Sequence, residues 1–230
     1  MRRKLNKTQT QLDFTTPQLF GRGGRDRALI CLAKSGPLRI QHLAATIGSD
    51  PSRSIGMIHE LHRVGLVQTH RAPGYSYAMI TSDPTLNGPL MRLLLRLGRT
   101  FPVTVVASVP KTNNHWRRAT NPRLEEMFSS PARSSVLLLV AAAQITNTST
   151  TAKVLHSSYS QAERTINYWE RQGVTTSEHI AGQRFTRLDE RFYAAAELRD
   201  FLETLVRLMP NFQRMGLEAR VNACPPPHLP

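Results

Sequence analysis

The feature that most constrains this chain is an internal repeat. When the sequence is shifted by 108 positions without a gap, residues 20–102 align with residues 128–210, and sixteen of the 83 aligned positions are identical. Unrelated segments of this length share about five at ordinary residue frequencies. The identities include Phe20/Phe128, Ile58/Ile166, Gly65/Gly173, Gly74/Gly182 and Pro102/Pro210. Two copies are too few for a solenoid, so the repeat predicts two copies of one small domain.

Three segments lie outside the two copies. We predict a flexible basic arm at residues 1–19, a linker at 103–127 and a Pro-rich, disordered tail at 211–230. The chain has 230 residues, of which 40% are hydrophobic. This is enough for two domains with cores of their own.

Both copies show the same order of predicted elements. Apolar spacing, Gly and Pro punctuation predict helices at 25–34, 40–47, 52–64 and 89–97, with strands at 66–70 and 75–80 around a turn at 71–74. The second copy gives helices at 131–143, 150–155, 160–172 and 194–208, with strands at 174–179 and 183–188. The predicted fold class is mainly α with small β-hairpin wings, that is, tandem winged helix-turn-helix domains.

Charge differs between the two copies. The chain carries a formal net charge of +14, and proteins this basic commonly bind nucleic acid. The first copy has eleven Lys or Arg against four Asp or Glu, a balance of +7, whereas the second has nine against eight, a balance of +1. The two copies therefore share a plan without sharing the same affinity for polyanions.

Several function classes are disfavoured. The two cysteines, Cys31 and Cys224, suggest neither a disulfide framework nor a metal site, which fits a cytoplasmic, nucleoid-associated location. The longest apolar run, 136–143, is too short to span a membrane, and the first twenty residues do not resemble a signal peptide. His59 and His62 have a metal-compatible spacing but no third ligand. We expect no catalytic residues, no cofactor and no metal, and hence no enzyme.

Segments of the second copy carry a family resemblance. FSSPARSSVLLLVAAAQ, SQAERTINYWERQGV, the pair Ala181-Gly182 and ERFYAAAELRDFLETL together resemble bacterial winged helix-turn-helix transcriptional regulators of the ArsR/MarR-like kind. The resemblance covers the second copy and, more loosely, the first. It implies double-stranded DNA as partner and a homodimer as the usual state. Metal sensing is not implied, because Leu43, Ala44 and Ala45 stand where metal-sensing members have a Cys-x-Cys motif.

Candidate DNA contacts follow from placing the third helix of each copy in a major groove, which is wide enough for one α-helix. In the first copy these are Ser52, Arg53, Ile55, Gly56 and His59 on the helix, with His70 and Arg71 on the wing. In the second they are Ser160, Gln161, Arg164 and Tyr168 on the helix, with His179 and Arg184 on the wing. Arg53 is the strongest candidate, since an arginine near the start of such a helix can pair with guanine.

Other aromatic residues have simpler interpretations. Trp169, Tyr75, Tyr77 and Phe185 are expected to pack into the cores. Trp116, followed by Arg117 and Arg118, is either a phosphate-binding or base-stacking arm or an amphipathic connector.

The sequence thus favours a sequence-specific DNA-binding transcriptional regulator. The leucine-rich helices 89–97 and 194–208 could form an internal pseudo-dimer interface, or two chains could pair as a homodimer. Two other functions stay open: a plasmid or mobile-element replication initiator, and a winged-helix adaptor that binds other proteins.

Overall fold

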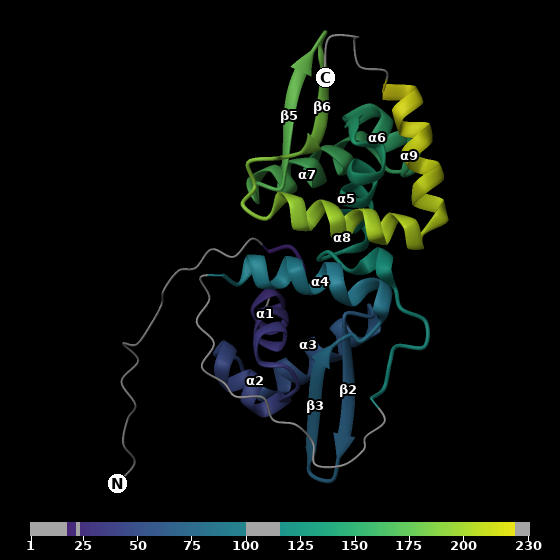
Figure 1. The fold of residues 1–230 in the computed structure, drawn as a ribbon. Coiled ribbons are helices and arrows are strands. Elements are labelled where there is room, and N and C mark those ends of the chain that lie inside the picture. The colour runs from purple at the N-terminus through teal and green to yellow at the C-terminus, as the bar shows by residue number, and fades with distance from the viewer. Residues whose placement is uncertain (1–17, 22–23, 100–115, 224–230) are drawn as a thin grey trace, which may run out of the picture.

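The computed structural model describes residues 18–21, 24–99 and 116–223. This part of the chain is mainly helical, with two small antiparallel sheets of three strands each (Figure 1). The first half contains α1 (Arg25–Ser35), β1 (Leu38–Arg39), α2 (Ile40–Ile47), α3 (Pro51–Arg63), β2 (Val67–Ala72), β3 (Tyr75–Ile80) and α4 (Pro84–Leu97). After a 3-10 turn at Leu124–Glu126, the second half contains α5 (Pro131–Ala143), β4 (Ile145–Asn147), α6 (Thr148–Val154), α7 (Tyr159–Arg171), β5 (Thr175–Ile180), β6 (Gln183–Leu188), α8 (Ala195–Leu208) and α9 (Pro210–Ala223).

The order of elements repeats with the sequence. A shift of 108 positions brings α3 onto α7, β2 onto β5 and β3 onto β6 without any offset at either end. The strand orders, β1-β3-β2 and β4-β6-β5, match as well. Even the pairing register is kept, because Leu38 opposite Ala78 corresponds to Thr146 opposite Thr186. Residues 20–102 and 128–210 therefore share one plan of secondary structure wherever both are described.

Local signals in the sequence explain where α3 and α7 begin and how the hairpins turn. The Asp50 carboxylate accepts hydrogen bonds from the backbone N–H groups of Ser52 and Arg53, and Ser158 caps α7 in the same way. In the second hairpin Ala181 and Gly182 both have positive φ, 50° and 77°, as a two-residue turn between antiparallel strands requires.

One hydrophobic cluster runs through both halves of the described chain. Phe20 stacks on Phe128 with ring centroids 5.6 Å apart, and Phe201 of α8 packs against both rings. Around them α4 packs against α8, and Arg92 and Asp200 form an ion pair of 2.6 Å at the margin. Figure 1 shows α4 and α8 side by side in the middle, with the hairpins β2–β3 and β5–β6 at opposite ends. The expected packing of helices 89–97 and 194–208 against each other is confirmed.

Some expected boundaries were wrong. The helix predicted from residue 89 begins at Pro84, because Asp83 accepts hydrogen bonds from the N–H groups of Thr85 and Leu86. The helix predicted at 150–155 begins at Thr148, where Asn147 provides the cap. The short strands β1 and β4 were not predicted, since two or three residues are too few to show an alternating pattern.

The prediction of a disordered tail from residue 211 was also wrong for residues 211–223, which form most of α9. Phe212, Ala219 and Ala223 are buried, and the backbone of Gly216 lies against Ala142 of α5. Arg220 donates hydrogen bonds to the last carbonyl groups of α5. Residues 1–17, most of the predicted linker and residues 224–230 lie outside the described part of the chain.

Candidate nucleic-acid interface

The outer face of α3 is open to solvent. Ser54, Met57, Ile58 and Leu61 point into the core and fix the rotation of the helix. All five predicted contact residues lie on the opposite, exposed side: Ser52, Arg53, Ile55, Gly56 and His59. Ile55 has 43% of its surface exposed, so its side chain is accessible to a ligand. An exposed helix face with a mixture of apolar and cationic groups is suited to reading base edges.

The β2–β3 hairpin stands beside this helix and carries two further predicted residues. Arg71 is exposed, whereas His70 is half-buried between the rings of Tyr77 and Trp116. Tyr77 lies in the core as expected, but the expectation for Tyr75 was wrong, since 46% of its surface is exposed. Tyr75 adjoins the turn, where the hairpin extends past the helices that could bury it.

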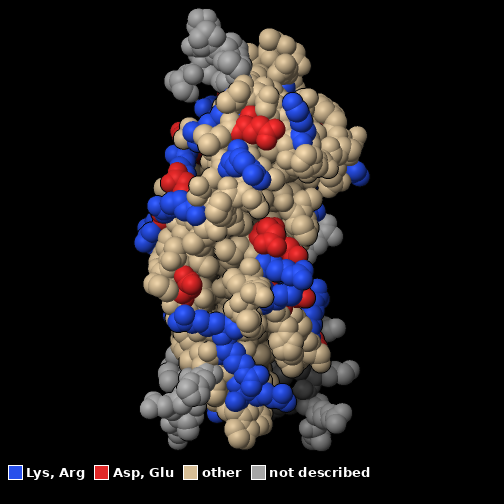
Figure 2. All heavy atoms as spheres, turned by 90° about the vertical axis from the view of Figure 1, so that its right-hand side faces the viewer, with Lys and Arg blue, Asp and Glu red and all other residues tan. Residues whose placement is uncertain are grey.

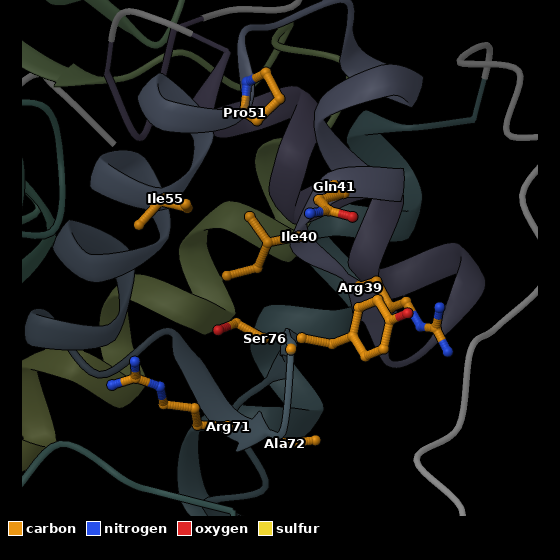
Figure 3. A pocket seen from close by; sticks show the side chains of 10 residues that line it. Arg39, Ile40, Gln41, Pro51, Ile55, Arg71, Ala72 and Ser76 are labelled. Atoms are coloured by element: carbon orange, nitrogen blue, oxygen red, sulfur yellow. The ribbon is translucent and has the colours of Figure 1, made fainter.

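A groove of about 340 Å³ separates α3 from the hairpin. Figure 3 shows Ile55 of α3 and Ile40 of α2 on its helical side, with Arg71 and Ser76 on the hairpin side. Arg39, which was not among the predicted contacts, lines the groove with its guanidinium 4.2 Å from the centre of the Tyr75 ring. Stacking on an aromatic ring orients an arginine while leaving its N–H groups available for anions.

Residues 116–118 add cations along β2. The backbone of Arg117 exchanges two hydrogen bonds with Thr69, of 2.8 and 3.2 Å, and so extends the edge of the sheet. Trp116 packs against His70, which supports the amphipathic-connector interpretation of this segment. Arg117 and Arg118 are both exposed, and Arg118 donates to the Ser82 hydroxyl.

The cations of this face differ in whether acidic groups neutralise them. Within the described residues, neither Arg53 nor Arg71 has an acidic partner. Arg63, further along α3, bonds Glu60 at 2.8 Å and Glu126 at 2.6 Å, and these hydrogen bonds raise its pKa. Figure 2 shows Lys and Arg atoms running down the lower half of the molecule, which holds the first repeat, while acidic and basic groups mix above. The first repeat therefore presents net positive charge where α3 and the hairpin project.

The corresponding face of the second repeat is more constrained. Ser160 is exposed, but the Arg164 guanidinium bonds the carbonyl of Ser160 at 3.1 Å and the side chain of Gln161 at 3.3 Å. His179 is exposed on the hairpin, as expected. The Gln161–Arg164 pair lies along the surface of α7, where both side chains remain within reach of a ligand.

The expectation that Tyr168 faces outward was wrong, and a second predicted contact, Arg184, is already paired within the protein. Tyr168 does not face outward: it is buried, its ring stacks under Arg133 at 3.7 Å, and its hydroxyl donates to the Gln18 carbonyl. Arg184 is half-buried and paired with Glu170 and Asn167. In both cases the partner lies on another segment of the chain, 150 residues away for Tyr168 and 14 to 17 residues away for Arg184, so the helical pattern alone could not reveal it.

On the helix–hairpin side, positive charge is lost at five equivalent positions and gained at two, Arg164 for Gly56 and Arg184 for Ser76. At slots facing the helix–hairpin side, cationic or histidine residues of the first repeat are replaced in the second by neutral, acidic or weakly basic ones: Arg39 by Asn147, Arg53 by Gln161, His62 by Glu170, His70 by Glu178 and Arg71 by His179. The Arg39–Tyr75 stack becomes a hydrogen bond from Asn147 to Gln183. The same backbone plan thus carries two chemically different surfaces.

The described residues show no metal site and no membrane-spanning helix. No group of three or more His, Cys, Asp or Glu side chains gathers there in a metal-binding arrangement. None of the helices in the described ranges combines the length and apolar character needed to cross a bilayer. Comparisons of the chain with protein-family models, curated proteins and solved structures gave no significant match.

Proposed function

We propose that this chain is a sequence-specific, double-stranded DNA-binding transcriptional regulator built from two tandem winged helix-turn-helix units. The observation that carries the proposal is the pairing of an exposed helix face bearing Arg53 with an adjacent hairpin bearing Arg71, neither neutralised by an acidic group within the described residues. This side belongs to the repeat with a net charge of +7 (eleven basic against four acidic residues). The resemblance to ArsR/MarR-like regulators, carried by the second repeat, points the same way.

In this proposal α3 enters a major groove. Arg53, in the first turn of α3, donates two hydrogen bonds to a guanine, and Ile55 contacts a thymine methyl group. Arg71, Arg117 and Arg118 lie to the side of the helix, where they bind phosphates and fix the orientation of the domain without reading sequence. The groove between α3 and the hairpin gives a phosphate strand room to pass Arg39.

A winged-helix adaptor is the second candidate, and one observation favours it. The hairpin and helix of the second repeat carry Glu163, Glu170 and Glu178 where the first carries Ile55, His62 and His70. Carboxylates on that surface repel a phosphate backbone but are compatible with a protein partner. The adaptor function predicts that the arginines of the first repeat are dispensable.

The deciding experiment is a titration of labelled duplexes, enriched from a random library by the wild-type protein, with the double variant Arg53→Ala/Arg71→Ala. We expect affinity to fall by about 30-fold or more, since the variant removes two contacts that each contribute on the order of 1–3 kcal/mol, and the salt dependence to weaken by about one counterion. The matched control is Arg99→Ala/Arg214→Ala, which removes the same charge from exposed arginines elsewhere that form no ion pair within the described residues.

The control separates local contact from overall charge. If both double variants lose the same affinity, only net charge matters and the proposed interface is wrong. If neither loses affinity, or if no duplex is enriched at all, the adaptor function is favoured.

A further inference from the structure

Equivalent residues of the two repeats meet each other in the middle of the molecule. Phe20 stacks on Phe128, and Arg92 pairs with Asp200 at 2.6 Å. Each pair is separated by 108 positions, the period of the repeat. In a two-fold interface, a residue touches its own equivalent only close to the rotation axis. The two contacts therefore locate a pseudo-two-fold axis between α4 and α8.

The helices along this axis are already buried by each other. Leu90 and Leu94 of α4, together with Leu198 and Leu202 of α8, have at most 1% of their surface exposed. In an isologous homodimer, the equivalent helix of one chain would pack here against the same helix of the other chain. Here the second repeat occupies it, so a single chain supplies both recognition helices.

The axis also sets how α3 and α7 are placed. Rotation by a two-fold axis leaves the position along that axis unchanged, so α3 and α7 lie at the same level along it, and whatever part of each exposed face points along the axis points to the same side in both. The hairpins point to opposite ends (Figure 1). This is the arrangement in which paired units bind two inverted half-sites on one face of a duplex, about 34 Å or one DNA turn apart.

The two repeats differ where they would read bases. Several residues of the interface and cores are identical, such as Phe20 and Phe128, Leu90 and Leu198, or Leu94 and Leu202. Ser52 and Ser160 are identical, but the other four candidate contact positions of α3 differ from their equivalents on α7: Arg53 against Gln161, Ile55 against Glu163, Gly56 against Arg164 and His59 against Asn167. Arginine pairs with guanine, glutamine with adenine, and a carboxylate accepts from the cytosine amino group. Two helices with these side chains cannot prefer the same half-site.

We infer that the DNA target of this protein is an asymmetric site, bound by one chain, in which two unlike half-sites stand in inverted orientation about one turn apart. The first half-site contains the guanine read by Arg53, and the second is read by Gln161 and Glu163. This inference rests on the proposed DNA-binding function and goes beyond it. A homodimer of identical units would instead select a palindrome.

The test begins with selection of duplexes from a random library by the full chain, followed by native mass spectrometry of the complex. We expect a bipartite motif without two-fold symmetry and one chain per duplex. A palindromic motif, two chains per duplex, or a motif with a single half-site would overturn the inference while leaving DNA binding intact. Failure to enrich any duplex would overturn the proposed function itself.

The variant Arg53→Gln sharpens the test, because it gives the first repeat the residue of the second at that slot. Binding to the wild-type duplex should fall about 10- to 100-fold, and repeated selection should exchange guanine for adenine in one half-site only. The control Arg214→Gln alters an exposed side chain of α9, outside both α3 and α7, and should leave the motif unchanged. A change in both half-sites after Arg53→Gln would show that two chains, not one, occupy the duplex.

Discussion

Asp26 offers the sharpest test of how the two repeats are held together. Its side chain is only 5% exposed, in the first turn of α1. One carboxylate oxygen accepts hydrogen bonds from the N–H groups of Leu19 and Phe20, at 3.0 and 3.3 Å. Ser134 occupies the equivalent position in the second repeat and accepts from the N–H of Phe128 at 2.8 Å. Both residues thereby fix the phenylalanines that stack across the pseudo-two-fold axis.

Burial raises the pKa of Asp26 from 3.8 to about 7, against the opposing effects of the backbone hydrogen bonds and of Arg25. The folded protein therefore binds a proton that the unfolded chain releases between pH 3.8 and about 7. Stability falls as pH rises across this window, because the native state holds more protons than the unfolded state. At about 1.4 kcal/mol per pH unit, the loss reaches about 4 kcal/mol by pH 8, with about 3 kcal/mol of it above pH 5.

The perturbation is Asp26→Asn, which keeps the acceptor oxygen and removes the titration. Urea unfolding of wild type and variant should be compared at pH 5, 6, 7 and 8. We expect the difference in free energy of unfolding, variant minus wild type, to rise by about 3 kcal/mol between pH 5 and pH 8. The value of this difference at pH 5 itself does not affect the test. Asp26→Ser, which copies the second repeat, should show the same pH slope as Asp26→Asn.

Other titrating groups cancel in this difference. Hydrogen bonds from arginines lower the pKa of Glu126 and of Asp189, so those carboxylates stabilise the fold at neutral pH and lose this effect under acid conditions. They are present in both proteins. Parallel pH curves for wild type and Asp26→Asn would show that Asp26 is already ionised in the fold, and would refute the reasoning from its burial.

Much of the fold could be predicted because its signals are local. Gly65 and Gly173 end α3 and α7 one position beyond their cap residues, and Asp50 with Pro51 marks the start of α3. The repeat added a second observation of every boundary. Periodicity gave the buried faces of α4 and α8, which is why their mutual packing could be expected.

The wrong or incomplete predictions concern side-chain contacts between different secondary-structure elements. Its place in the helical pattern predicts that Tyr168 faces outward. In the structure its hydroxyl donates a hydrogen bond to the carbonyl of Gln18, 150 residues away. Arg184 was expected to contact DNA, but it forms an ion pair with Glu170. Glu170 occupies the position that His62 has in the first repeat. The spacing of Phe212, Met215 and Ala219 did contain a helical signal for α9, which the neighbouring proline run obscured.

Two further substitutions separate stability from binding. Ala181→Gly should raise the free energy of unfolding by about 1 kcal/mol in urea denaturation, because Ala181 holds a left-handed φ of 50° that disfavours a Cβ; a lower value would show that the turn is not strained. Gly56→Ala tests whether α3 lies on DNA. A Cβ there meets no atom within 4 Å, so the variant should gain about 1 kcal/mol of helix stability. The same methyl group projects from the exposed face and would hold α3 away from the floor of the major groove, so affinity for the selected duplex should fall. A stabilised protein that binds as tightly as wild type would place Gly56 outside the interface.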